Sequence, residues 1–102
     1  MKNPEFTLHV RFRSKLTLDQ VMKIMDERLP EFRALEGLQQ KYYLQDAATG
    51  EFAGLYLWES KEALTDYRDS ELRASIAKAY QAEGEPRVEI YRVIKTLRGD
   101  RD

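Results

Sequence analysis

Two side chains suited to proton transfer and anion binding alternate in the stretch FTLHVRFR, residues 6–13. His9 is the only histidine of the chain, and imidazole is the side chain that ordinarily exchanges its proton near neutral pH, so His9 is the candidate base or proton shuttle. Arg11 carries a planar guanidinium that can hold a phenolate or a carboxylate. A simpler role is open to both: His9 as a surface or interface residue, and Arg11 in a salt bridge between subunits.

Aromatic side chains that carry a polar atom are the candidates for a substrate pocket, namely Tyr42, Tyr56, Trp58 and Tyr67. Each joins an apolar ring to a hydroxyl or an indole N–H, so it can contact an apolar molecule and also donate a hydrogen bond. Side chains alternate along a strand, so at most one of Tyr42 and Tyr43 shares a pocket with Tyr56 or Trp58. Packing in the core is the simpler role for all of them.

The composition narrows the function classes. A chain of 102 residues with a formal net charge of −1 fits one domain over residues 1–102 and lacks the positive field expected of a nucleic-acid or anionic-membrane binder. It has no cysteine, so no thiolate ligand or disulfide is possible, and we expect no metal site and no cofactor. No membrane-length apolar run or signal-peptide pattern is present, so we expect a cytoplasmic protein.

The first part of the chain is predicted to form a strand followed by a helix. Apolar and polar residues alternate over residues 6–13, which is typical of a strand with one buried face. Thr17 and Gln20 form a capping-box pattern ahead of an apolar stripe, which predicts a helix. Pro30 predicts a kink or break near Leu29, with the last turn ending at Gly37.

The rest of the chain is predicted to add two strands, a helical segment and a last strand, which gives the order strand–helix–strand–strand–helix–strand. Residues 38–46 and 51–58 should pair antiparallel through a short loop that contains Gly50. Ser60 is expected to cap a short helix, Ser70 to start a second one that ends at Gly84, and residues 87–97 to form the last strand.

This order predicts a ferredoxin-like α+β fold, in which a four-stranded antiparallel sheet carries its helices on one face. The stretch FAGLYLW, residues 52–58, is apolar on both of its faces, although the helices can cover only one. A second copy of the sheet is the economical cover for the other face. We therefore expect a homodimer in which two subunits form a dimeric α/β barrel.

The segment LPEFRALEGLQQKYYLQDAATGEFAGLYLWESKEALTDYRDSELRASI, residues 29–76, resembles the antibiotic-biosynthesis-monooxygenase superfamily, and most closely its YdhR-like branch. The similarity rests on Gly37, on the strand GLYLW at residues 54–58 with Glu59 and Ser60 after it, and on LHV at residues 8–10. These positions mainly determine a fold.

The resemblance implies a monooxygenase that needs neither metal nor flavin and that acts on a small aromatic or phenolic substrate in an apolar pocket between sheet and helices. Such chemistry requires a group that removes an acidic substrate proton and donors that stabilise the resulting anion. His9 and Arg11 are the candidate catalytic residues, and Tyr42, Tyr56, Trp58 and Tyr67 are the candidate substrate contacts.

A non-catalytic homodimer that binds a small apolar or aromatic molecule is the alternative that stays open. An RNA-recognition domain shares the order of elements, but its third strand needs a basic residue and stacking rings that GEFAGLYLW does not provide. Haem-degrading relatives place a histidine ligand in a helix where residues 70–78 have none.

Overall fold

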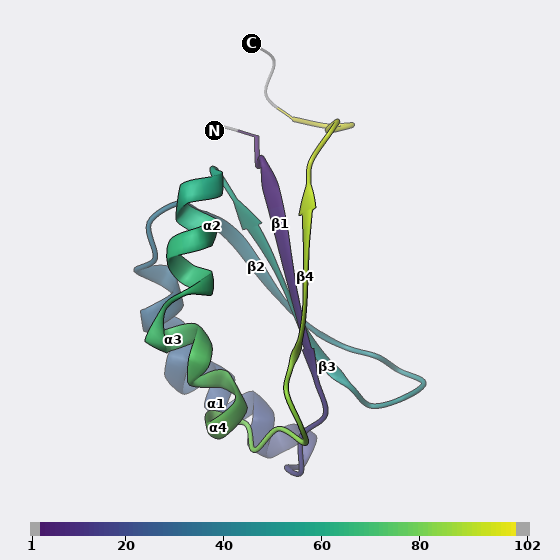
Figure 1. The fold of residues 1–102 in the computed structure, drawn as a ribbon. Helices are drawn as coiled ribbons and strands as arrows, with labels where there is room; N and C mark the ends of the chain where they lie inside the picture. Colours follow the sequence, from purple (N-terminus) through teal and green to yellow (C-terminus); the bar gives the residue numbers. More distant parts are fainter. Residues whose placement is uncertain (1–2, 100–102) are drawn as a thin grey trace.

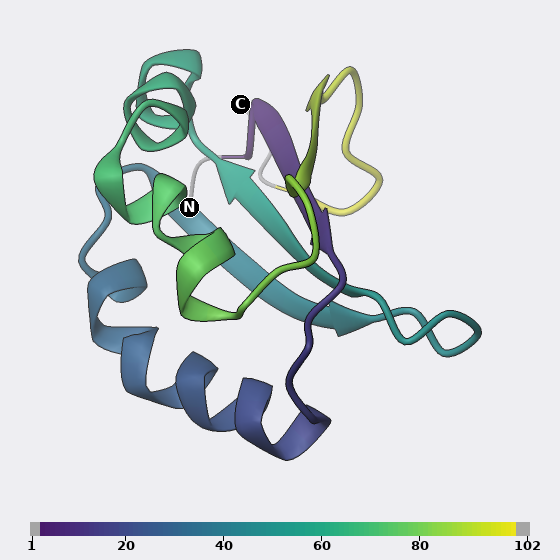
Figure 2. The same ribbon diagram turned by 60° about the horizontal axis from the view of Figure 1, so that its bottom comes forward.

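The computed structural model describes residues 3–99 and confirms the predicted ferredoxin-like fold (Figure 1). Its four-stranded antiparallel sheet has the strand order β2-β3-β1-β4, and Figures 1 and 2 show the helices together on one face of it. The elements are β1 (Phe6–Phe12), α1 (Leu18–Arg33), β2 (Leu38–Gln45), β3 (Phe52–Trp58), α2 (Lys61–Arg68), α3 (Glu71–Ala74), α4 (Ile76–Ala79) and β4 (Arg87–Arg92).

Helix α1 begins where the sequence predicts, but it continues through Pro30. The Thr17 side chain accepts from the Gln20 backbone N–H while the Gln20 side chain accepts from the Thr17 backbone N–H, a complete capping box. The predicted break near Leu29 is wrong, because the helix runs on to Arg33. Proline removes one backbone donor close to the helix end, and the burial of Phe32 in the core holds the last turn in place.

The β2–β3 connection forms as predicted, with Gly50 in the left-handed region at φ 78°. The Asp46 carboxylate accepts from the backbone N–H groups of Ala48 and Thr49, which orders the turn. This hairpin projects beyond the rest of the sheet in both ribbon views.

The helical segment before β4 is shorter than predicted. Ser60 and Ser70 cap α2 and α3 as expected, but α4 ends at Ala79 and not at Gly84. Gln81 takes a positive φ of 49°, and the following residues pair with the chain just after β1: Ala82 bridges to Ser14, and Glu83 N–H donates to the Arg13 carbonyl. These pairings turn the chain away from a helical path.

Strand β4 also ends early, at Arg92 and not at residue 97. Arg92 lies opposite Phe6, the first residue of β1, so the partner strand ends there. One further bond, from Val93 N–H to the Glu5 carbonyl, precedes a segment in which Ile94 and Leu97 are 86% and 88% exposed.

Gly37 is required by a close approach between the start of β2 and helix α2. Its φ is 80°, its carbonyl accepts from Glu59 N–H, and an added Cβ would collide with the Ala63 side chain. We expect Gly37→Ala to lower the free energy of unfolding by roughly 2 kcal/mol, measured by urea denaturation. Gly50→Ala is the matched control. Its φ is 78°, but apart from its two chain neighbours no atom of the described residues lies within 4 Å of an added Cβ, so the substitution should cost about half as much. Equal losses would contradict the steric argument.

Candidate functional site

Strand β3 divides the molecule into two environments. Phe52, Gly54, Tyr56 and Trp58 point toward the helices and are buried, whereas the alternate residues Ala53, Leu55 and Leu57 lie on the face that no helix covers. We call these the helix side and the open face of the sheet. Within one chain, only the helix side of this apolar strand is covered.

Three of the predicted substrate residues meet on the helix side. The rings of Tyr56 and Trp58 are parallel within 4°, with centroids 6.2 Å apart, and Tyr67 of α2 packs against both. The Tyr56 and Tyr67 hydroxyls are hydrogen-bonded at 2.9 Å. All three residues are almost fully buried.

Lys41 of β2 also points into this side and was not among the residues selected from the sequence. Its Nζ lies 3.5 Å from the ring centroid of Phe32, 4.3 Å from that of Tyr43 and 4.5 Å from that of Tyr56. We call these three rings the Lys41 cage. Ring faces attract an ammonium group, most strongly where water is excluded.

The sequence did hold a signal for Lys41. Lys41 and Tyr43 are two residues apart on β2, and Lys41 lies opposite Tyr56 in the sheet, so strand alternation places all three side chains on one face. A lysine in phase with core aromatics is unusual enough to be singled out.

Lys41 lies without a carboxylate counter-charge in the part of the chain that the structure describes. Burial, followed by the nearby Arg28 guanidinium, lowers the pKa of Lys41 from 10.5 to about 7, while the cage rings act in the opposite direction because they stabilise the ammonium. Among residues 3–99, neither Lys41 nor Arg28 forms an ion pair with a carboxylate. Near neutral pH, Lys41 can therefore exist in both protonation states.

Two hollows meet at Lys41 and Tyr43. The inner one, between sheet and helices, has a volume of about 20 Å³, which is room for about one water molecule. The outer one is a groove of about 340 Å³ along α1 and the edge strand β2, with Leu29, Phe32 and Leu38 among its lining residues. We call it the α1–β2 groove. Its size is in the range of small-molecule sites.

Gly54, in the middle of β3, lies in close contact with the side chains of Tyr56 and Lys41. A Cβ on Gly54 would lie 2.9 Å from Cε1 of Tyr56 and 3.4 Å from Cε of Lys41. The missing side chain therefore leaves room for the Tyr56 ring and the Lys41 chain. In this way a glycine in the middle of a strand is explained by its neighbours.

The buried tyrosines keep their hydroxyl protons at neutral pH, so they can donate hydrogen bonds but are not available as bases. Burial raises the pKa of Tyr67 and of Tyr80 to about 12, and it raises the pKa of Tyr56 well above its ordinary value. In the Tyr56–Tyr67 pair one hydroxyl donates to the other, so one O–H is left to donate elsewhere. Nε1 of Trp58 and Nε of Arg28 are further buried donors without an acceptor in residues 3–99.

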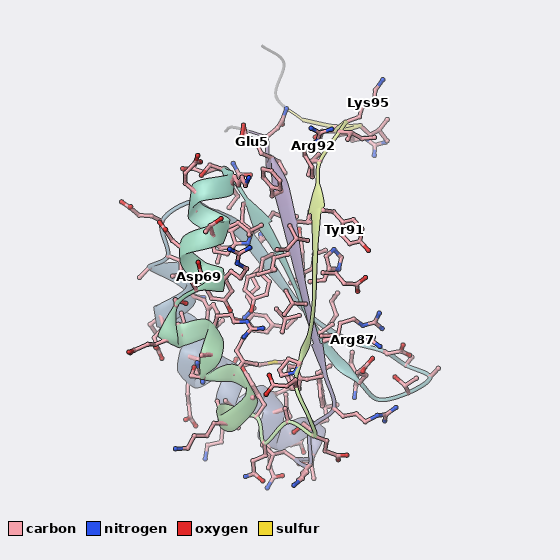
Figure 3. All side chains as sticks on the ribbon, viewed as in Figure 1. Glu5, Asp69, Arg87, Tyr91, Arg92 and Lys95 are labelled. Atoms are coloured by element: carbon pink, nitrogen blue, oxygen red, sulfur yellow. The ribbon has the colours of Figure 1, made fainter. Side chains whose placement is uncertain are left out.

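The other predicted residues lie on the open face. His9 stands between Leu55 of β3 and Glu89 of β4, and Tyr42 lies on the far side of Leu55. The imidazole packs edge-on against Tyr91 at 5.5 Å, and the Tyr91 hydroxyl donates to Glu89 at 3.0 Å. Figure 3 shows Tyr91 and Arg87 projecting from β4 to the side away from the helices.

Arg11 already has negative partners on the open face. Its guanidinium lies 3.5 Å from a Glu51 oxygen and 3.8 Å from an Asp46 oxygen, and Arg87 reaches the same Glu51 oxygen at 3.6 Å. A shallow groove of about 300 Å³ here includes His9, Arg11 and both carboxylates.

The structure thus groups the sequence-selected residues into two sets. Tyr56, Trp58 and Tyr67 lie together on the helix side, and His9, Arg11 and Tyr42 lie on the open face. The two sets are on opposite faces of one sheet. Within a single chain, His9 cannot reach a substrate held against Tyr56 or Tyr67.

Two classes of site are not found in the part of the chain that the structure describes. No three potential metal-binding side chains gather among residues 3–99. In the same range no helix has the length and apolar character that crossing a membrane requires.

The chain belongs to the family described as "Putative mono-oxygenase ydhR", which matches residues 6–98. This confirms the predicted branch of the monooxygenase superfamily. A comparison with curated protein sequences finds no match.

Solved structures of low sequence identity share the fold. NE2512 from Nitrosomonas europaea, of unknown function, is 14% identical with a TM-score of 0.73, and the alignment covers 98% of this chain and 99% of that one. SnoaB, a cofactor-independent oxygenase from Streptomyces nogalater, is 13% identical with a TM-score of 0.72 over 92% and 97% of the two chains. Rv0793 from Mycobacterium tuberculosis is 16% identical with a TM-score of 0.69 over 91% and 98%.

Proposed function

We propose that the protein is a cofactor-independent monooxygenase that oxidises a small aromatic or phenolic substrate on the helix side of the sheet. The observation that carries the proposal is a cationic amine, Lys41, held among aromatic rings beside an apolar groove in a member of a mono-oxygenase family. SnoaB, which shares the fold, supports the absence of a cofactor. Tyr56, which is itself a ring of the Lys41 cage, and Trp58 and Tyr67, which pack against it, are the proposed aromatic walls of the site.

The reaction needs only substrate, dioxygen and a proton acceptor. Removal of the phenolic proton of the substrate gives a phenolate whose negative charge is shared with ring carbons, and this anion transfers an electron to dioxygen. A ring carbon that carries hydrogen then combines with the superoxide formed, and the resulting peroxide loses water to give a quinone, so that C₆H₅OH + O₂ yields C₆H₄O₂ + H₂O. The protein supplies the base, the donors that stabilise the anion, and exclusion of bulk water.

Oxygen uptake by purified, metal-free protein with anthrone, quinol and catechol substrates tests the proposal. We expect uptake above spontaneous oxidation, one oxygen atom from labelled dioxygen in the product, and a loss on the order of 10-fold in kcat/KM for Tyr56→Phe because an anion-stabilising donor is removed. Tyr91→Phe on the open face is the matched control and should retain the wild-type rate.

The outcomes separate the candidate functions. Binding of the aromatic substrates without oxygen uptake would contradict the proposed monooxygenase activity. It would favour the alternative, a non-catalytic homodimer that binds a small aromatic molecule. His9→Ala tests the candidate base that the sequence suggested: loss of uptake in this variant, with Tyr56→Phe active, would place the chemistry on the open face.

We further propose that a second copy of the chain covers the open face. Ala53, Leu55 and Leu57 of β3 form an apolar strip there, and Tyr42 and Leu44 of β2 extend it while 49% and 45% exposed. Charges of both signs flank the strip, with Arg11 and Arg87 beside Glu51 and Glu89. A two-fold axis can therefore pair apolar with apolar surface and positive with negative groups.

A further inference from the structure

The helix side holds buried donors and positive charge for which residues 3–99 supply no partner. Lys41 contacts ring faces, and Arg28 uses one nitrogen on Ser75, while Nε of Arg28 and Nε1 of Trp58 find no acceptor in that range. Buried donors without acceptors and a buried cation without a counter-charge are both costly. An arrangement of this kind is complementary to an anion.

The α1–β2 groove gives an aromatic anion a place to bind. Leu29, Phe32 and Leu38 offer an apolar wall, and Lys41 stands at the boundary between the groove and the inner cavity. Arg33 lines the same groove and adds a second cation toward solvent. An aromatic ring on the apolar wall would hold its polar substituent toward the amine.

We propose that the α1–β2 groove binds a phenol, and that Lys41 takes the phenolic proton and then holds the phenolate as its ammonium counter-ion. The proposal deepens the proposed function, on which its catalytic meaning rests, by narrowing the substrate class to phenols and by naming the base. Proton transfer breaks the O–H bond of the phenol and forms an N–H bond on Nζ, with no oxidant involved. The binding step is therefore testable without turnover.

The position of Lys41 fits both halves of this role. Near neutral pH a substantial share of the amine is free of its proton, because burial and Arg28 lower the pKa of Lys41 to about 7. Once protonated, it supplies the positive charge that the phenolate needs. Arg28 and Arg33 of α1 add to this field, while Tyr43, Tyr56 and Tyr67 bring no negative charge at neutral pH because burial raises the pKa of each.

A phenol that reports its own ionisation tests the inference. The electron-withdrawing nitro group of para-nitrophenol makes its phenolate a poor electron donor to dioxygen, and this phenolate is yellow. At about pH 6, where free para-nitrophenol is mostly un-ionised, we expect the wild-type protein to turn the bound probe yellow with saturation at one probe per chain. Lys41→Met should weaken this signal at least ~10-fold.

Two variants control for folding and for simple charge. Lys41→Arg retains a positive charge but cannot accept a proton, so it should still hold the phenolate with a yellow signal and should lose oxygen uptake with oxidisable phenols. Lys23→Met, on the exposed surface of α1, should behave as the wild type. Circular dichroism verifies that each variant is folded. A wild type that binds no yellow probe, or a yellow signal that persists in Lys41→Met, would overturn the proposal. A yellow signal without oxygen uptake on oxidisable phenols would instead support the phenol site and contradict the proposed monooxygenase activity.

Discussion

In urea, the free energy of unfolding of the wild-type protein is expected to rise between about pH 7 and pH 9.5, and this rise should be absent in Lys41→Met. Lys41 is the physical cause. Its pKa falls from 10.5 to about 7 on folding, so over this range the unfolded chain holds a proton on Lys41 that the folded chain has released. Stability therefore increases with pH, and it decreases as the pH falls toward 7.

The size of the effect follows from the shift. Each unit of pKa shift corresponds to about 1.4 kcal/mol, so the full shift of Lys41 would change the free energy of unfolding by several kcal/mol. We expect a smaller change, on the order of 3 kcal/mol, because the amine can swing into the α1–β2 groove and regain water. The rise in stability ends near pH 10. Above that pH the tyrosines of the unfolded chain lose their protons, whereas the buried tyrosines, whose pKa values are raised, retain theirs, and this makes folding less favourable. The charged and titratable groups around Lys41 are Arg28, Arg33, Tyr43, Tyr56, Tyr67 and Tyr80.

Matched variants separate this effect from general alkaline behaviour. Lys41→Met should be more stable than the wild type at about pH 6, because it removes a desolvated cation and keeps an apolar chain of similar length. Lys23→Met, on the exposed face of α1, should keep the wild-type slope. If Lys41→Met retains the slope, Lys41 is solvated in the folded state and the electrostatic account of the site is wrong.

The sequence predicted the order of the elements because each has a local cause. The capping box at Thr17, the serines that cap α2 and α3, and the left-handed Gly50 are all satisfied by near neighbours in the chain. The errors came from distant contacts. Ser14 pairs with Ala82, which ends the last helical turn early, and β1 begins at Phe6, so β4 has no partner strand beyond Arg92. Local patterns carry no information about such pairings.

The candidate site was predicted in part, for a related reason. Alternation shows which residues of one strand share a face, but it does not relate the faces of two strands. Only the register of β1 and β3, with His9 opposite Leu55, places His9 on the face opposite to Tyr56. Lys41 was missed because a lysine is normally solvated, and its surroundings come from three separate elements: Phe32 from α1, Tyr43 from β2 and Tyr56 from β3. Only the packed structure brings these rings together.

Leu55→Asp is expected to dissociate the proposed homodimer while each subunit stays folded. Leu55 lies at the centre of the open face, between Tyr42 of β2 and His9 of β1, so a second sheet placed there would bury it. In a dimer the new carboxylate would lose its water, at a cost of several kcal/mol, which raises the dimer Kd more than ~100-fold. In a single subunit the same carboxylate remains hydrated.

Sedimentation velocity at micromolar concentration measures this difference, with Met22→Asp as the matched control. Met22 is 50% exposed on α1, away from the open face, so the same charge there should leave the dimer intact. The Lys41 cage lies on the opposite side of the sheet, so Leu55→Asp should still turn para-nitrophenol yellow. The proposal is wrong if the wild-type protein sediments as a single chain or if the Leu55→Asp variant stays dimeric, because a second copy then does not cover this face. If Leu55→Asp loses both the dimer and the yellow signal, the phenol site needs both subunits.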